Sequence, residues 1–131
     1  MRYNKKFVDY YDLNESIVIK AYHGSRENKI RDFNVRDSEA LRVSGIYFSK
    51  NKEEAKKYTK IKGIQDENRI TTVEITFKNP ADREVLDKLG YRLNGIEMKN
   101  KLISMGYDGV IDDFMDEIVV FNKNQIKILD V

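Results

Sequence analysis

The sequence predicts an α+β domain with mainly antiparallel sheets. Short segments rich in β-branched residues alternate with a few capped helical segments, a mixture typical of that architecture. One proline and no Gly/Ser-rich linker or repeat in 131 residues argue against a domain boundary. About 40% of the residues are hydrophobic, which is enough for one core. We therefore expect a single domain over residues 1–131, in which residues 1–15 form an N-terminal arm or a short helix.

The first strand is expected at residues 16–22, where Ile and Val dominate a run that Gly24 and Ser25 end. Residues 26–44 are polar with a few apolar anchors, so they are predicted to form a long loop with at most one helical turn. Long ordered loops in small domains often carry function. A second, short strand is expected at residues 45–49.

The next predicted elements are a helix and a longer strand. The helix begins after Asn51, a good N-cap residue, and runs to about Lys60. Glu54 follows Asn51 by three positions, the spacing of a capping box. Within residues 69–77, mostly polar side chains alternate with mostly apolar ones, which predicts a half-buried strand.

Two short helices are expected in the second half of the chain. Pro80 is predicted to open the first of them, because proline is favoured in a first helical turn, and Gly90 to close it. The second covers about residues 95–105, and Gly106 is its stop.

The chain is predicted to end in three strands. Residues 107–111 and 117–121 are joined by an acidic turn, and residues 125–129 form the last strand. The run 118–121 is apolar on both strand faces, which is typical of a strand buried on both sides.

Composition excludes several classes of protein. The formal net charge is +2, from 24 basic and 22 acidic residues, which argues against electrostatically driven binding to nucleic acid or membrane. The absence of cysteine excludes disulfides and thiolate zinc sites, and a single histidine excludes multi-histidine metal sites, so no metal is expected. No segment resembles a signal peptide or a membrane span, and a soluble, cytoplasmic protein is expected. Gly-rich phosphate loops and the Gly-x-Ser-x-Gly elbow are also missing.

Glu117 stands at the mouth of the doubly apolar run, where a carboxylate carries a desolvation cost unless something pairs with it. Two interpretations are open at this point. The side chain is an edge residue that faces water, or it is held in a cleft to face developing positive charge.

His23 and two tyrosines are the other candidates. His23 ends an apolar strand and precedes Gly24, where a missing side chain lets a ligand approach the backbone. A lone histidine is also common as a structural residue. Tyr47 and Tyr58 are either core aromatic residues whose hydroxyl groups contact water or, taken together, a clamp for a flat heterocycle.

These candidates fall within short blocks that follow one another along the chain. The blocks are 22–26 (YHGSR), 45–49 (GIYFS), 55–58 (AKKY), 77–80 (FKNP), 106–111 (GYDGVI), 117–121 (EIVVF) and 121–127 (FNKNQIK). In this order they resemble ADP-ribosyltransferases of the His-Tyr-Glu branch, which includes diphtheria toxin and the poly(ADP-ribose) polymerases. The resemblance covers about residues 17–130, and within the family the chain is similar to small bacterial and phage members.

The resemblance implies an ADP-ribosyltransferase-like fold, with two mainly antiparallel sheets around an NAD cleft and a few peripheral helices. NAD is then the substrate. His23, Tyr47 and Glu117 would be the catalytic residues. By resemblance, His23 would hydrogen-bond a ribose hydroxyl of NAD, and Glu117 the 2′-hydroxyl of the nicotinamide ribose.

The resemblance also implies a set of NAD-binding residues. They are His23, Gly24, Ser25, Tyr47, Phe48 and Tyr58. Gly24 would hold the nicotinamide carboxamide through its backbone, and Ser25 would lie by the adenosine ribose. Tyr47 and Tyr58 would sandwich the nicotinamide ring.

Two positions depart from the relatives. Polymerizing members have a serine where this chain has Ala55, so one hydrogen bond to the carboxamide is lost. Arginine-modifying toxins have a second glutamate where this chain has Met115, which argues against arginine as the acceptor. The acidic turn before Glu117 is expected to face the acceptor, with Phe114 and Met115 either contacting it or folding back onto the core. The residues assigned to this turn are Asp113, Phe114, Met115 and Asp116.

The predicted function is mono-ADP-ribosyl transfer from NAD to a protein acceptor, by a phage or bacterial effector that inactivates a host or defence protein. Two alternatives remain open. An NAD glycohydrolase toxin would use the same residues with water as acceptor. A binding module that keeps the fold without activity would neither consume NAD nor be stabilised by it. The near-neutral charge makes a nucleic-acid acceptor less favoured, and no membrane partner is expected.

Overall fold

A computed structural model describes residues 16–27 and 29–130, so the predicted N-terminal arm at residues 1–15 lies outside the described residues. The described chain forms two three-stranded sheets in which all neighbouring strands are antiparallel. The first sheet has the order β1 (Ile17–Gly24), β3 (Ile70–Phe77), β6 (Ile126–Ile128), and the second has the order β2 (Ile46–Phe48), β5 (Glu117–Val120), β4 (Gly109–Asp112). The predicted α+β architecture with antiparallel sheets is therefore confirmed.

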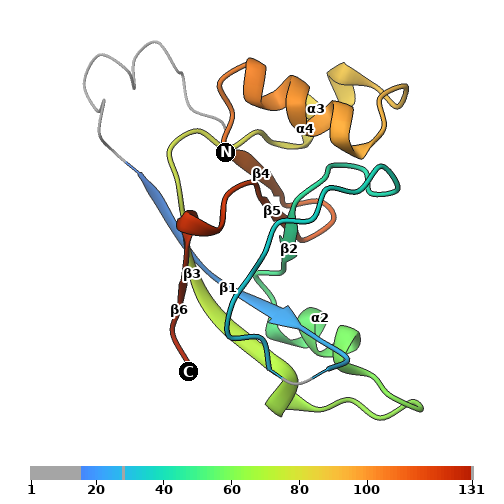
Figure 1. Ribbon diagram of the computed structural model, residues 1–131, viewed down its shortest axis with the longest axis vertical. Helices are drawn as coiled ribbons and strands as arrows, with labels where there is room; N and C mark the ends of the chain where they lie inside the picture. The colour runs from blue at the N-terminus through green and yellow to red at the C-terminus, as the bar shows by residue number, and fades with distance from the viewer. Residues whose placement is uncertain (1–15, 28, 131) are drawn as a thin grey trace.

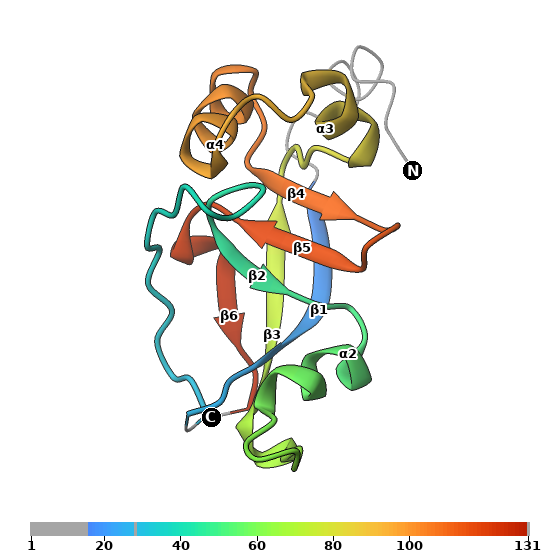
Figure 2. The same cartoon turned by 90° about the vertical axis from the view of Figure 1, so that its right-hand side faces the viewer.

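Helices lie at both ends of the pair of sheets (Figures 1 and 2). Helix α2 (Lys52–Lys56), extended by a 3-10 turn at Lys57–Thr59, follows β2 and packs near the end of β1. Helices α3 (Arg83–Leu89) and α4 (Gly95–Ser104) gather at the opposite end, beside β4.

The second sheet separates two hydrophobic cores, and β5 contributes to both. Ile118 and Val120 point into the core between the sheets, whereas Val119 points into the core beneath α3 and α4. All three side chains are at most 2% exposed, so the predicted burial on both faces is confirmed. Full burial of each such side chain contributes roughly 1.5–3 kcal/mol to stability.

The segment between β1 and β2 contains no helix or strand over residues 29–45, as the sequence predicts. It is nevertheless ordered by contacts with both cores. Phe33 enters the core between the sheets, and Val43 enters the core beneath the helices. The Thr71 hydroxyl bonds both backbone groups of Ile30, at 3.2 and 3.0 Å.

The predicted start of the helix after Pro80 is wrong. Helix α3 begins at Arg83, and Asp82 is its N-cap, accepting from the Val85 N–H at 3.1 Å. Ala81, the residue after the proline, instead forms a parallel β-bridge with Val110 and is not part of the helix. An Asp cap that satisfies a free N–H explains the later start. The closing glycine is confirmed, since Gly90 is the C-cap with φ 80°.

The predicted capping box at Asn51 is also wrong. Asn51 caps α2 by accepting from the Glu53 N–H at 2.8 Å, while Glu54 binds the ammonium of Lys57 at 2.9 Å. A complete capping box forms instead at α4. There Asn94 accepts from the Glu97 N–H at 2.9 Å, and the Glu97 carboxylate accepts from the Asn94 N–H at 3.0 Å.

The described residues lack a membrane-spanning helix and a metal-binding cluster of side chains. No helix in residues 16–27 or 29–130 combines the length and apolar character needed to cross a membrane. The same residues contain no group of three or more His, Asp or Glu side chains placed to hold a metal ion.

Candidate functional site

The edges of the two sheets meet beside His23. The Tyr22 N–H donates to the Ser49 carbonyl at 2.8 Å, and the Ser49 N–H donates to the Tyr22 carbonyl at 2.9 Å. This single bridge joins β1 to the end of β2. It therefore places His23 next to the backbone of Tyr47.

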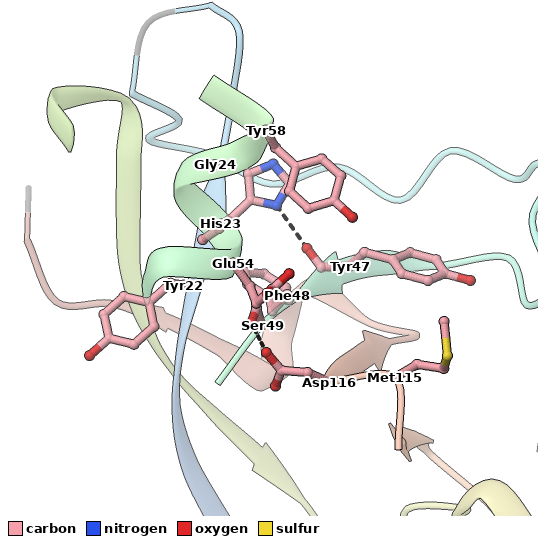
Figure 3. Close-up of a pocket in the computed structure, with 11 residues that line it drawn as sticks. Tyr22, His23, Gly24, Tyr47, Phe48, Ser49, Glu54, Tyr58, Met115 and Asp116 are labelled. Carbon is pink, nitrogen blue, oxygen red and sulfur yellow. Dashed lines mark hydrogen bonds between the residues drawn. The ribbon is translucent and has the colours of Figure 1, made fainter. Parts of the chain in front are cut away.

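The His23 ring is held in one orientation (Figure 3). Its Nδ1 lies 2.8 Å from the Tyr47 carbonyl oxygen, and Phe33 and Phe48 pack edge-on at 5.2 and 5.5 Å between ring centroids. Because a carbonyl only accepts, Nδ1 carries the proton and Nε2 is the acceptor of the neutral ring. Burial lowers the pKa of His23 below its ordinary 6.5, against a smaller opposing effect of the Tyr47 hydrogen bond. The ring is therefore neutral at neutral pH.

Gly24 presents its backbone to the same side as Tyr22. The Ser25 N–H donates to the Arg69 carbonyl at 3.1 Å, which makes Gly24 and Ile70 a non-hydrogen-bonded pair of the ladder. The N–H and C=O of Gly24 therefore point away from β3, toward the edge where Tyr22 binds Ser49. No hydrogen bond within residues 16–27 and 29–130 uses either group.

The missing side chain of Gly24 has a structural reason that the sequence did not suggest. A Cβ atom there would lie 1.9 Å from the Ala55 carbonyl oxygen and 3.2 Å from Thr59 Cγ2. Helix α2 thus occupies the space above Gly24. The glycine is required by close helix packing, rather than by the approach of a ligand from that direction.

A cavity of about 110 Å³, here called the His23 cavity, opens at this junction. Tyr58 forms an outer wall and is 64% exposed. Figure 3 shows the Tyr47 ring extending away from His23, toward Met115, while its backbone carbonyl faces the imidazole. The lining residues are Tyr22, His23, Gly24, Tyr47, Phe48, Ser49, Glu54, Ala55, Tyr58, Met115 and Asp116.

Glu117 lies on the same sheet face as the Tyr47 ring. Tyr47 pairs with Val119 across the strands, and side chains two residues apart share a face. The Glu117 carboxylate is partly buried and accepts no hydrogen bond from the described residues. Burial raises the pKa of Glu117, the charge of Asp112 raises it further, and Arg83 opposes both.

Glu117 lines a second cavity, here called the Glu117 cavity, of about 210 Å³. The two cavities share Tyr47 and Met115 as a common wall. The residues around the Glu117 cavity are Arg42, Val43, Tyr47, Arg83, Leu86, Tyr91, Val110, Asp112, Met115, Glu117 and Val119.

The structure thus brings most of the predicted site residues together, in two adjoining cavities rather than one. His23, Gly24, Tyr47, Phe48 and Tyr58 line the first, and Glu117 reaches the second. Ser25 lines neither, and its hydroxyl accepts from the Glu27 N–H at 3.1 Å. The Tyr47 hydroxyl is also occupied, because it donates to the Val43 carbonyl at 2.7 Å.

The turn before Glu117 is fixed by its own carboxylates. Asp112 accepts from the N–H groups of Phe114 and Met115 at 3.1 and 3.2 Å. Asp116, with φ 51°, accepts from the Ser49 hydroxyl and from the Lys50 N–H, and Asp113 pairs with the Lys50 ammonium. Phe114 is 79% exposed and Met115 52% exposed, so neither folds back onto the core.

Four charged or aromatic residues of the Glu117 cavity were not among the sequence candidates: Arg42, Arg83, Tyr91 and Asp112. Asp112 pairs with Glu117 in the β4–β5 ladder, a register that the predicted hairpin with its acidic turn already contained. Arg42 lies in the long loop and Arg83 in the first turn of α3. Nothing in their local sequence connects them with Glu117.

Comparison with known proteins identifies the family to which the chain belongs. Residues 17–130 match the family described as ADP-Ribosyltransferase in polyvalent proteins. The chain therefore belongs to that family, which is part of the ADP-ribosyltransferase superfamily. Domains of this superfamily use NAD as substrate. No match was found among curated proteins or among solved structures.

Proposed function

We propose that this protein transfers ADP-ribose from NAD to a protein acceptor and releases nicotinamide. The observation that carries the proposal is Glu117, a partly buried carboxylate without a hydrogen-bond partner among the described residues. It stands next to a cavity whose lining includes His23, Gly24 and Tyr58. An unpaired carboxylate in such a place is costly for stability, which favours a role in chemistry.

The His23 cavity suits a nicotinamide group. A primary carboxamide offers one acceptor and two donors, and the outward N–H and C=O of Gly24 complement them. The ring of Tyr58 supplies an aromatic wall for a flat heterocycle, and the Tyr47 ring lies at the boundary with the Glu117 cavity. Ala55 adds no side-chain hydrogen bond, so we expect the affinity for NAD to be modest.

His23 is suited to hold a ribose hydroxyl. Its Nδ1–H is used by the Tyr47 carbonyl, which leaves the Nε2 lone pair to accept from a hydroxyl. Phe48 is 4% exposed and packs against the imidazole, so its contribution is to orient His23 rather than to touch NAD. Ser25 remains a proposed neighbour of the adenosine ribose.

Glu117 is proposed as the catalytic carboxylate. NAD supplies a C1′–N bond to a positively charged nicotinamide, which is a good leaving group. Positive charge grows on the sugar as that bond breaks, as in glycoside cleavage. A carboxylate held in a partly desolvated place stabilises the developing charge more than it stabilises the ground state.

The finer predictions on ancestry and biology are part of the proposal. We infer that the chain belongs to the His-Tyr-Glu branch, since His23, Tyr47 and Glu117 surround adjoining cavities. The exposed turn with Asp113, Phe114, Met115 and Asp116 is proposed to face the acceptor. Action on a host or defence protein by a phage or bacterial effector is a further prediction.

The variant Glu117→Gln tests the proposal. It removes the charge and keeps the size, so we expect nicotinamide release from NAD to fall about 100- to 1,000-fold. The rise in melting temperature that NAD causes should persist, because Gly24, His23 and Tyr58 are unchanged. Nicotinamide release and thermal unfolding are the two measurements.

Glu39→Gln is the matched control, because Glu39 is exposed and its side chain makes no hydrogen bond or ion pair in the described structure. It should behave like the wild type. Wild-type turnover in Glu117→Gln would refute the catalytic assignment. If the wild-type protein neither consumes NAD nor is stabilised by it, the binding-module alternative holds. Release of free ADP-ribose without a labelled protein would favour the NAD glycohydrolase.

A further inference from the structure

Arg42 carries a charge that no carboxylate of the described structure neutralises. Its Nη2 donates to the Leu86 carbonyl at 3.2 Å, and the guanidinium lies 4.2 Å from the centre of the Tyr91 ring. No Asp or Glu oxygen of residues 16–27 and 29–130 forms an ion pair with it. A guanidinium has five N–H donors, so most of them are available to a ligand.

Arg83, the other arginine of the Glu117 cavity, is already paired. Asp112 lies 3.0 Å from its Nη1, and Asp87 lies 3.3 Å from its Nε. Its guanidinium also stands 5.1 Å from the centre of the Phe114 ring. Arg42 is therefore the cation of this cavity that is free to bind an anion.

The carboxylates near Glu117 are not free to act as a base. Asp112 is committed to Arg83 and to two backbone N–H groups, and Asp116 to Ser49 and Lys50. Glu54 is paired with Lys57. With Glu117 assigned to the ribose, the two cavities offer no further carboxylate to deprotonate an acceptor. An acceptor that arrives already deprotonated needs none.

Resting on the proposed function, we infer that the Glu117 cavity is the acceptor site and that Arg42 selects an Asp or Glu side chain of a protein. An acceptor carboxylate oxygen forms the bond to C1′ as the C1′–N bond breaks. The electron pair of that bond leaves with nicotinamide, which departs neutral, and no proton moves. A volume of about 210 Å³ far exceeds the roughly 10–15 Å³ that one water needs, so such a side chain fits.

The rim of the cavity favours a protein over a nucleic acid. Tyr91 and Met115 line the cavity and are 72% and 52% exposed, and Phe114, next to Met115 in the chain, is 79% exposed. Arg42 lies over the Tyr91 ring and Arg83 over the Phe114 ring. Exposed aromatic, methionine and arginine side chains are enriched where proteins meet.

The test uses the full chain with NAD labelled in the adenylate phosphate, and total cell lysate as the source of acceptors. We expect label on protein, sensitive to protease and not to nuclease, and rapidly released by neutral hydroxylamine, which cleaves esters of carboxylates. Arg42→Gln should lower the ratio of protein labelling to nicotinamide release about tenfold to a hundredfold, the range expected when a hydrogen-bonded charge pair is lost. Arg42→Lys should recover part of that ratio, because it restores a charge but not the planar fork.

Arg36→Gln is the matched control, since Arg36 is exposed and makes no hydrogen bond or ion pair in the described structure. The NAD-induced rise in melting temperature, measured for each variant, shows whether a lost ratio reflects damage to the NAD site. A hydroxylamine-resistant bond on protein, or an unchanged ratio in Arg42→Gln, would overturn the inference and leave the proposed function intact. Label on nucleic acid instead of protein would overturn the inference and the protein acceptor of the proposed function together. An absence of nicotinamide release by the wild type would overturn both the inference and the proposed function.

Discussion

Glu117 occupies an environment that opposes its ionisation, yet the proposed chemistry requires the ionised form. Burial is the largest cause of its raised pKa, the charge of Asp112 adds to it, and Arg83 acts in the opposite direction. We expect the rate of nicotinamide release to fall on the acid side at a pH above the ordinary pKa of 4.5. A pH profile of kcat/KM for NAD measures this fall on the acid side, here called the acid limb.

Asp112→Asn separates the two causes of the raised pKa of Glu117, which are burial and the charge of Asp112. The substitution removes the repulsion and keeps the size of the side chain, and it leaves more of the Arg83 charge to favour ionised Glu117. The acid limb should therefore move to lower pH, but not as far as 4.5, because burial is the larger cause. A limb that does not move would show that Glu117 is not the group that titrates.

The individual side chains of the site differed in how far their sequence context predicted them. Glu117 was a candidate because a carboxylate at the mouth of a doubly apolar strand is costly to desolvate, while an edge residue that faces water was the other interpretation. The structure places this side chain partly buried beside a cavity, where the sequence could not place Arg42. Arg42 was not a candidate, because a polar loop of this length places its side chains by tertiary contacts alone. The division into two cavities was also hidden, since it depends on which face of β2 carries the Tyr47 ring.

Close packing of α2 on β1 shapes the wall of the His23 cavity. The Ala55 carbonyl occupies the position that a Cβ of residue 24 would need, and a backbone atom cannot turn aside as a side chain can. Gly24→Ala should therefore shift α2, and with it Tyr58, at a cost of about 1–3 kcal/mol in stability. We expect a lower melting temperature and a smaller stabilisation by NAD, both measured by thermal unfolding.

Gly63→Ala is a control with a comparable cost and a different cause. A Cβ there meets nothing within 4 Å, but φ is 81°, so the cost of about 1–2 kcal/mol arises from the backbone alone. Stabilisation by NAD should remain that of the wild type in this variant. Equal loss of NAD stabilisation in both variants would mean that general destabilisation, and not the position of α2, explains the result.

Elements were predicted well where local signals agreed, and poorly where two signals competed. The alternation before Phe77 and the apolar run after Glu117 each matched a strand. Near Pro80 the preference of proline for a first helical turn competed with the capping ability of Asp82, and the cap won. Near Asn51 the spacing of a capping box was present, but the Glu54 carboxylate bound the Lys57 ammonium and not the Asn51 N–H.

The two cores of the whole molecule meet along β5, and the proposed chemistry lies where that strand begins. Ile118 and Val120 stabilise the core between the sheets, and Val119 stabilises the core beneath the helices. Glu117 immediately precedes these residues. Its position is thus determined by both cores, which explains how a costly carboxylate can be held in place.

This shared strand predicts that the two cores unfold together. Ile118→Ala in the first core and Met98→Ala in the second each remove a side chain that is 0% exposed, at a cost of about 2–5 kcal/mol. If β5 couples the cores, each variant should show one transition at a lower temperature, with far-ultraviolet and tyrosine circular dichroism coinciding. A second, earlier transition in Met98→Ala alone would mean that α3 and α4 melt independently. In that case Glu117 would be held by the core between the sheets only, and the Glu117 cavity, whose wall includes Leu86 of α3, would open before the His23 cavity.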